Sequence, residues 1–352
     1  MYWTWVDFWK PMSSPSLLAL RIAFAALSIT FIIASFLSFR FANPAVKLLY
    51  WIAALWLGLS NFLFLGAWTL WIADLILRLS VTTPARIAEK PYLAAAVLTV
   101  AVLTTVYGLV NARLLRVRQI TVRLPNLPPC WRNYRALLIT DMHLGHVNGL
   151  GFARRIAATA KELNPAVIFL AGDLFDGSKV DPLRIADPIL KLKPPLGTFF
   201  VGGNHEEFGG AAHFEAALRA GGIRVLHNDC VTVDGVHIVG VPYGRSTYPL
   251  QMRTFLESLR LKGGPACILL NHVPNRLPIA EHAGVNLQIS GHTHGGGQIF
   301  PFNFITRRAF GQFTYGLQRF GDMQVYTSSG AGTWGPPMRV GTNPEIVLLS
   351  FE

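Results

Sequence analysis

Five short groups of acidic, amide and imidazole side chains follow one another along the chain. In order they are Asp141-Met-His143, Gly172-Asp173-Leu-Phe-Asp176, Gly202-Gly-Asn204-His205-Glu206, the single His272, and Gly291-His292-Thr-His294-Gly295. Carboxylate, amide and imidazole ligands together suit Mn, Fe, Zn or a similar divalent ion. With His205 and Asp176 set aside, three Asp or Asn and four His are too many ligands for one four-coordinate zinc ion. They suit two ions, about 3.5–4 Å apart, that clamp the attacking and leaving oxygens of an in-line phosphoryl displacement.

The elements that must position these groups are short strands. Each group directly follows an apolar run of strand length, and a further run of this kind lies between them: Ala136–Thr140, Val167–Ala171, Thr198–Val201, Val236–Val241, Cys267–Asn271 and Leu287–Ser290. The stretches 152–163 and 213–220 are typical of helices, and this alternation predicts an α/β domain. Because sites in open α/β sheets form outside the carboxyl ends of the strands, the five groups are expected to converge.

In this order, D-x-H, G-D-x-x-D, G-N-H-E, a single H and G-H-x-H resemble the calcineurin-like metallophosphoesterase superfamily over residues 119–352. Two segments, S-G-H-T-H-G-G-G-Q-I from Ser290 and S-S-G-A-G-T-W-G-P-P-M-R from Ser328, are similar to one branch of it. That branch holds bacterial membrane-associated phosphodiesterases, some of which hydrolyse UDP-2,3-diacylglucosamine. The resemblance implies a four-layer α/β/β/α sandwich. The chain departs from the pattern at Glu206, where many relatives have Asp, and in one additional glycine among Gly295–Gly297.

The resemblance also implies a role for each residue. The first metal ion would be bound by Asp141, His143 and His294, the second by Asn204, His272 and His292, and Asp173 would bridge the two. His205 would contact the scissile phosphate and protonate the leaving group, while the carboxylate of Asp176 would orient its ring. We expect Mn in both positions, with Fe or Zn as alternatives. The nucleophile would be a hydroxide on the metal, because a divalent ion lowers the pKa of its bound water.

The first third of the chain predicts a membrane region. Only 14% of all residues are charged, against about a quarter in an ordinary soluble domain. Ile22–Phe39, Leu48–Ala73 and Tyr92–Ala112 carry no charge and reach the length of about 20 residues that a membrane-spanning helix needs. We therefore divide the chain into a membrane region, 1–118, and a catalytic domain, 119–352. The second run exceeds one span, and a hairpin broken near Gly58–Asn61 would give four spans in place of three.

Charge bears on the partners and on the side of the membrane. The formal net charge of +12 fits nucleic acid, an anionic membrane surface or a phosphorylated substrate. Basic residues directly after the last apolar run favour the membrane surface: Arg113, Arg116, Arg118 and Arg123. Lysine and arginine counts at the span ends place the catalytic domain in the cytoplasm, on a bacterial inner or plasma membrane. Without a run of basic and aromatic residues in the catalytic half, nucleic acid is not an expected partner.

Together these features predict a membrane-anchored, two-metal phosphoesterase. It would cleave a phosphodiester or pyrophosphate bond in a lipid-linked or membrane-proximal substrate. The alternatives are a nuclease or general phosphatase with the same site, and an inactive membrane-bound binding module. Asp74 and Arg78, four residues apart at the end of the second run, are expected to pair on one helix face.

Overall fold

The computed structural model describes residues 1–9 and 13–352. By its contacts the chain forms two compact units. The first, the helical unit, contains Met1–Asn111 together with Gly335–Val340, and the second, the catalytic unit, contains Ala112–Trp334 and Gly341–Glu352. The domain division at residues 118 and 119 stays a prediction.

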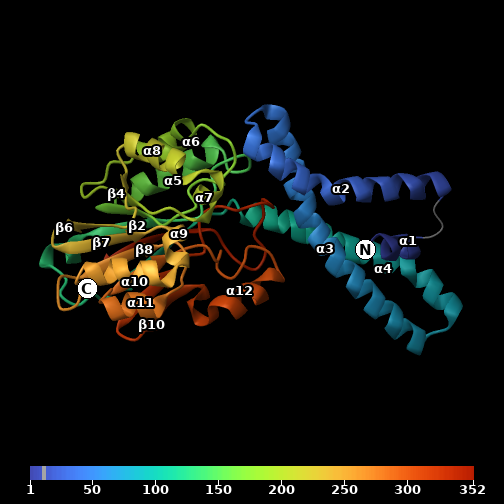
Figure 1. Cartoon of the computed structure of the whole chain (residues 1–352). Helices are drawn as coiled ribbons and strands as arrows, with labels where there is room; N and C mark the ends of the chain where they lie inside the picture. Colours follow the sequence, from blue (N-terminus) through green and yellow to red (C-terminus); the bar gives the residue numbers. More distant parts are fainter. Residues whose placement is uncertain (10–12) are drawn as a thin grey trace. The chain divides into compact units, whose positions relative to one another are not determined.

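The helical unit contains α1 (Tyr2–Phe8), α2 (Ser14–Arg40), α3 (Pro44–Ser80) and α4 (Thr83–Asn111) (Figure 1). The side chains of Ser13 and Asn43 cap the starts of α2 and α3 by accepting hydrogen bonds from backbone N–H groups. Helices α2, α3 and α4 are each long and apolar enough to cross a membrane. Helix α3 continues through Gly58–Asn61, so the alternative hairpin at that point does not form.

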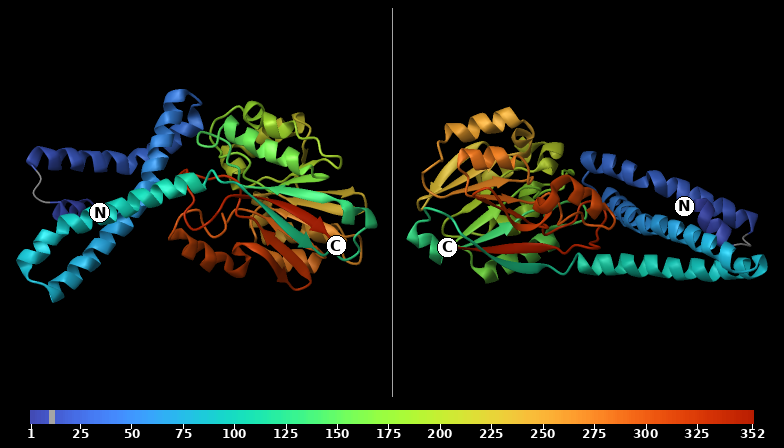
Figure 2. Two further views of the ribbon diagram at one scale, coloured as in Figure 1. Left: turned by 180° about the vertical axis from the view of Figure 1, so that it is seen from behind. Right: turned by 90° about the horizontal axis from the view of Figure 1, so that it is seen from below.

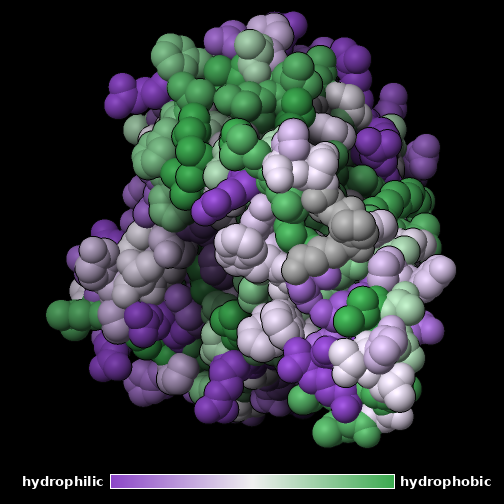
Figure 3. Space-filling model, turned by 90° about the vertical axis from the view of Figure 1, so that its right-hand side faces the viewer, coloured by the Kyte–Doolittle hydropathy of each residue, from purple (hydrophilic) through white to green (hydrophobic). Residues whose placement is uncertain are grey.

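Apolar side chains of these helices lie at the surface. Phe36 on α2, Trp68 on α3 and Leu103 on α4 are each about two thirds exposed, at 70%, 60% and 61%. Hydrophobic residues, green in Figure 3, form extended patches at the surface in that view. Exposed apolar surface on this scale is typical of helices that lipid covers.

The buried carboxylate of Asp74 orders the α3–α4 hairpin end. It pairs with Arg78 at 2.9 Å, which confirms the predicted pair, and with Arg86 at 3.2 Å. Lys90 stands 3.7 Å away. An unpaired buried carboxylate would cost several kcal/mol, so these cations hold the end of α3 against the start of α4.

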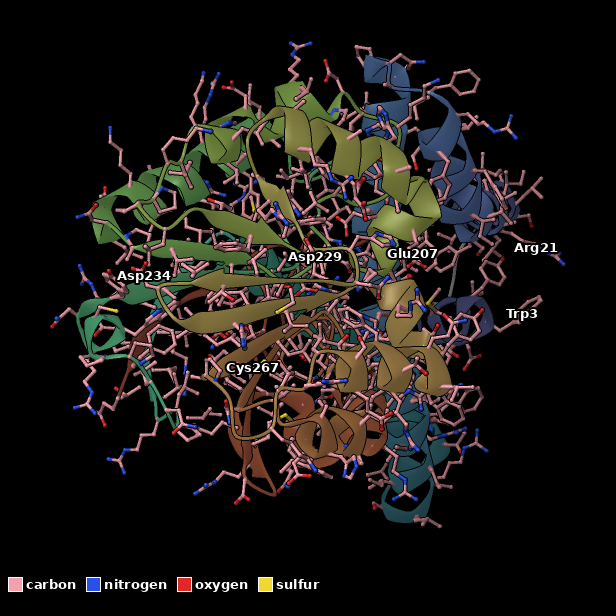
Figure 4. The ribbon with its side chains drawn as sticks, turned by 60° about the vertical axis from the view of Figure 1, so that its left-hand side comes forward. Trp3, Arg21, Glu207, Asp229, Asp234 and Cys267 are labelled. Carbon is pink, nitrogen blue, oxygen red and sulfur yellow. The ribbon has the colours of Figure 1, made fainter. Side chains whose placement is uncertain are left out.

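Helices α1 and α2 are in contact through a cation–π pair. The guanidinium of Arg21 on α2 lies over the ring of Trp3 on α1, 5.8 Å from its centroid (Figure 4).

The segment Gly335–Val340 joins the helical unit from the far end of the chain. Met338 packs against Gly58 of α3 so closely that a Cβ there would lie 2.3 Å from the methionine methyl group. The backbone N–H of Arg339 donates to the carbonyl of Gly108 at 2.9 Å. The side-chain amide of Asn111 donates a second hydrogen bond, to the carbonyl of Arg339 at 3.1 Å. The C-terminal P-P-M-R stretch is thus a packing segment of the helical unit.

The catalytic unit is built on two six-stranded mixed sheets (Figure 2). The first has the order β1 (Arg116–Val122), β12 (Glu345–Phe351), β2 (Arg135–Ile139), β3 (Val167–Leu170), β4 (Thr198–Phe200) and β5 (Arg224–Val225). The second has the order β10 (Gly316–Phe320), β11 (Met323–Thr327), β9 (Leu287–Ser290), β8 (Cys267–Asn271), β7 (Val236–Val241) and β6 (Asp229–Val233).

Strand periodicity builds the layers. In β2, Ala136 and Leu138 point into the core between the two sheets, whereas Leu137 and Ile139 point outward. The outer face of the first sheet is covered by α5 (Leu150–Leu163), α6 (Pro182–Leu190) and α8 (Ala211–Ala220). The outer face of the second is covered by α10 (Pro249–Ser258) and α11 (Leu277–Ala283). The result is the predicted four-layer α/β/β/α sandwich.

The six predicted strands are present as β2, β3, β4, β7, β8 and β9, with ends that differ by at most one residue. The predicted helices at 152–163 and 213–220 are α5 and α8. Within the first sheet β2, β3 and β4 are parallel, and within the second β7, β8 and β9 are parallel. The residues that follow these strands therefore meet at one edge of the sandwich.

Candidate metal centre

The side chains that follow β2, β3, β4, β8 and β9 converge at this edge. Three sets place one nitrogen or oxygen atom of each member within 4.8 Å of the others: Asp141, His143 and His294; His143, Asp173 and His205; and Asp173, His272 and His292. Asn204 joins them, because its Oδ1 lies 3.0 Å from Nδ1 of His292. The structure brings together every predicted metal-binding residue; their role as ligands stays a prediction.

The carboxylate of Asp173 lies between two groups of histidines. On one side, Nε2 of His143 is 3.9 Å from Asp173 Oδ2 and 3.2 Å from Nε2 of His294. On the other side, Nε2 of His272 is 3.1 Å from the same oxygen. The Asp173 carboxylate therefore belongs to two of the candidate ligand clusters at once.

Hydrogen bonds to the backbone fix the direction of these side chains. Nδ1 of His272 donates to the carbonyl of Ala171 at 2.8 Å, which turns Nε2 toward Asp173. The N–H of His205 donates to Asp173 Oδ1 at 2.9 Å. Partners of this kind set the tautomer and orientation of metal-binding histidines and carboxylates.

The backbone of the site is strained. Five of the seven predicted ligands have positive φ angles: Asp141 at 51°, His143 at 47°, Asp173 at 52°, His292 at 67° and His294 at 50°. Each such residue costs about 1–3 kcal/mol and persists only where the surroundings over-determine it. Neighbouring glycines permit this crowding, because a Cβ on Gly203 would lie 2.2 Å from Asp173 Oδ1 and one on Gly291 would lie 2.2 Å from Asp141 Oδ2. Strained backbone thus brings the predicted ligands together at a cost in stability.

The electrostatics of the site favour a positive charge at its centre. Burial raises the pKa of Asp141 to about 6. For Asp173 burial acts in the same direction, but the charge and hydrogen bond of His272 outweigh it and hold the pKa of Asp173 below its usual range. For His272 burial is outweighed by Asp173, which raises the pKa of His272 to about 10. Two buried carboxylates that draw a proton onto the imidazole between them fit a site made for divalent cations.

His205 is held by a different atom of Asp176 from the one predicted. Its Nδ1 lies 3.0 Å from the main-chain carbonyl of Asp176. The Asp176 carboxylate instead accepts hydrogen bonds from the backbone of Ser178 at 2.8 Å and of His146 at 3.2 Å. In the structure the main-chain carbonyl faces Nδ1 in place of the expected carboxylate, whose oxygens lie on the turn that follows it, and a role of that carboxylate in orienting His205 stays a prediction. A carbonyl only accepts, so Nδ1 of His205 carries the hydrogen and Nε2 is left for a substrate.

Glu206 has a role that the sequence argument missed. Its buried carboxylate accepts hydrogen bonds from the backbone N–H groups of Gly203 at 2.7 Å, Asp173 at 3.0 Å and Phe175 at 2.9 Å. It therefore ties the loop after β3 to α7 (Asn204–Gly209). Burial and the charge of Asp173 raise the pKa of Glu206 to about 7. The position of Glu206 directly after His205 was the signal available in the sequence.

An aromatic wall beside His205 was also missed. The rings of Trp334 and Phe208 lie 5.3 and 5.5 Å from that of His205. The side-chain amide of Gln298 donates to the Trp334 carbonyl at 2.5 Å and accepts from its N–H at 3.0 Å. Gln298 and Trp334 belong to the two glycine-rich segments singled out in the sequence, and this pair of bonds explains how those segments act together.

Comparison with known proteins identifies the family of this chain. A family model described as calcineurin-like phosphoesterase matches residues 134–296. An uncharacterized metallophosphoesterase of Aquifex aeolicus is 30% identical over 258 residues, which cover 72% of this chain and 98% of that protein. An uncharacterized metallophosphoesterase of Campylobacter jejuni is 31% identical over 242 residues, 67% of this chain and 63% of that protein. A transmembrane protein with metallophosphoesterase domain from Danio rerio is 32% identical over 267 residues, 70% of this chain and 60% of that protein.

The chain spans less than two thirds of the Campylobacter and Danio proteins, at 63% and 60% of their lengths. It covers the Aquifex protein almost completely. The matched region contains all five residue groups that meet at the sheet edge, up to Gly295. The chain therefore belongs to the calcineurin-like phosphoesterase family of metal-dependent phosphoric ester hydrolases.

Proposed function

We propose that this metallophosphoesterase is a membrane-anchored enzyme that uses two divalent cations to hydrolyse a phosphodiester or pyrophosphate bond in a lipid-linked or membrane-proximal substrate. One observation carries the proposal: the Asp173 carboxylate lies between His143 and His272, at 3.9 and 3.1 Å from their Nε2 atoms. That arrangement supports a pair of cations rather than one.

The residues would divide between the cations as follows. Asp141, His143 and His294 would hold the first, Asn204, His272 and His292 the second, and Asp173 both. When bound, two such cations, Mn or else Fe or Zn, would polarise the phosphoryl oxygens and lower the pKa of water. The chain's own task is to hold these ligands rigidly, which the strained backbone and the glycine contacts achieve.

His205 would supply the proton for the leaving group. Its Nδ1 is fixed on the carbonyl of Asp176 and its backbone N–H on the Asp173 carboxylate, at 3.0 and 2.9 Å. Both bonds orient the ring, so in its doubly protonated imidazolium form His205 would transfer the Nε2 proton to the departing oxygen. General acid catalysis of this type contributes about 10²–10⁴-fold in rate.

The aromatic wall favours a leaving group that is itself a sizeable organic moiety. Trp334 and Phe208 flank the general acid, and they are 46% and 63% exposed. A simple phosphomonoester with a small leaving group would leave these rings in water, whereas a diester or nucleotide-linked substrate would stack on them. The resemblance to enzymes that cleave UDP-2,3-diacylglucosamine makes that pyrophosphate the first physiological class to test.

The membrane anchor would be formed by α2, α3 and α4. Exposed arginines follow α4 directly, at Arg113, Arg116, Arg118 and Arg123, and would face anionic headgroups. By the positive-inside rule the catalytic unit would then lie on the cytoplasmic side of a bacterial inner or plasma membrane.

The test is turnover of bis-p-nitrophenyl phosphate by the detergent-purified full chain, stripped of metal and then supplied with Mn. With a diester whose leaving group is an alkyl alcohol, which needs a proton to depart, His205→Ala should lower kcat by about 10²–10⁴-fold, whereas the loss with p-nitrophenolate as the leaving group should be smaller. The control is His213→Ala, an exposed histidine on α8 outside the site. Equal turnover in His205→Ala and the control would overturn the assignment, and so would turnover of the wild-type chain that needs no added metal.

A further inference from the structure

Helix α12 (Phe302–Phe310), whose position Figure 1 shows, differs from the other α-helices of the catalytic unit, each of which buries at least one residue. None of its residues is buried. Phe302, Phe304 and Ile305 are 53%, 64% and 69% exposed. On a helix of 3.6 residues per turn, Phe304 and Ile305 lie on the face opposite Asn303 and Thr306, whereas Phe302 begins the helix one turn before Thr306 on the same side. A short helix that presents phenylalanine and isoleucine to the outside needs a partner for that face.

The inner face of α12 rests on the loop that follows the last predicted ligand. A Cβ on Gly297 would lie 3.3 Å from the Thr306 hydroxyl and 3.2 Å from the backbone nitrogen of Asn303. At the end of the helix, the ring of Phe310 lies 6.0 Å from that of His292. The helix is therefore a direct neighbour of the metal centre, although its outward residues take no part in it.

The charge of this face points to an anionic partner. Arg307 and Arg308 are exposed on α12, and residues 298–314 contain no Asp or Glu. A short helix with phenylalanine and isoleucine outward, and arginines that reach past them, is the pattern of helices that lie in the headgroup region of an anionic bilayer.

The chain itself brings a bilayer within reach. Helix α4 ends at Asn111 and β1 begins at Arg116, so residues 112–115 make the whole connection. Even fully extended, this connection spans less than about 20 Å. If α4 crosses a membrane, the catalytic unit stays next to that membrane at all times.

We propose that α12 is an interfacial membrane-binding helix, which inserts Phe304 and Ile305 among the headgroups of an anionic bilayer while Arg307 and Arg308 contact lipid phosphates. The inference rests on the membrane anchor proposed above, but not on the hydrolytic activity. Its consequence is that the metal centre would open at the lipid surface.

The test measures the depth of α12 in lipid with the full chain in nanodiscs. A nitroxide is attached to Ile305→Cys in a chain in which Cys130 and Cys230 are replaced by Ser; the remaining Cys267 is buried. Collision rates with oxygen, which enriches in lipid, are compared with those of a water-soluble nickel chelate. The matched control carries the nitroxide at Leu183, an exposed residue of α6 in the opposite helical layer. Discs of phosphatidylcholine with and without phosphatidylglycerol, and the double variant Arg307→Gln/Arg308→Gln, complete the set.

The proposal predicts that oxygen collisions exceed nickel collisions several-fold at position 305 in anionic discs, while position 183 is water-exposed. Neutral lipid or the double variant should shift position 305 toward water. Nickel access at 305 equal to that at 183 in anionic discs would overturn the proposal. Exclusion of both reagents would also overturn it, because a protein partner or a second copy would then cover the helix. Soluble-diester turnover, measured on the same discs, reports separately on the proposed function.

Discussion

The main-chain carbonyl of Asp176 holds the ring of His205, with 3.0 Å between the oxygen and Nδ1, while the carboxylate of the same residue binds the backbone of Ser178 and His146. A substitution at residue 176 leaves that carbonyl in place. The proposed general acid, His205, and the carboxylate predicted to orient it are therefore separable by mutation.

Asp176→Asn should keep kcat within about tenfold of the wild-type value, whereas His205→Ala should lose about 10²–10⁴-fold. Asparagine can still accept one of the loop hydrogen bonds, so we expect a loss of stability of about 1 kcal/mol. The measurement is kcat across a range of pH, together with Tm. If Asp176→Asn is as inactive as His205→Ala, the carboxylate does orient the histidine and the role given to the carbonyl is wrong.

Glu206→Gln should destabilise the site through its hydrogen bonds. The carboxylate accepts from three backbone N–H groups, and a glutamine would present its own NH₂ to at least one of them. A buried donor left without an acceptor costs about 1–3 kcal/mol. Unfolding followed by circular dichroism checks this, with Glu207→Gln in the same helix as the control. Unfolding free energies that agree between the two variants would show that Glu206 does not tie β3 to α7.

Trp334→Ala should raise KM for bulky diesters by about two- to twelvefold, which corresponds to the 0.5–1.5 kcal/mol of an aromatic stacking contact. Trp334→Phe should recover most of the loss. Gln298→Ala should imitate the alanine variant, because the Gln298 amide holds the Trp334 backbone on both sides. The measurement is KM and kcat for diesters of increasing size. A uniform fall in kcat with KM unchanged would mean that Trp334 supports the fold of the site and not the substrate.

Most of the site was predictable because its residues sit at strand ends, and parallel strands place those ends at one edge. The arrangement of β12 was not predictable in this way. Strand β12 lies between β1 and β2. The residue pattern of Glu345–Phe351 does not indicate which strands it pairs with, because those strands lie some two hundred residues earlier in the sequence. The exposed position of α12 was not predictable for another reason. Phe302, Phe304 and Ile305 are residue types that usually lie in a core, but their side chains are exposed. The direction of the Asp176 side chain depends on a turn whose geometry the residue types do not specify.

The native cysteines should report the side of the membrane. Cys130 is exposed, whereas Cys267 is buried in β8, and burial raises the pKa of its thiol (Figure 4). A raised pKa leaves less thiolate at neutral pH, so Cys267 should resist maleimide while Cys130 reacts. In intact cells a membrane-impermeant maleimide should leave Cys130 unlabelled, and permeabilisation should allow labelling. Cys130→Ser is the control. Labelling of Cys130 in intact cells would place the catalytic unit outside the cytoplasm.

The central claim is a two-cation site bridged by Asp173, and the metal content of the purified full chain tests it most directly. After dialysis against Mn and removal of free metal, inductively coupled plasma mass spectrometry should find two Mn ions per wild-type chain and fewer than one per Asp173→Asn chain. The control His282→Asn, a histidine outside the site on α11, should keep both. A single ion in the wild-type chain, or two in Asp173→Asn, would contradict the account.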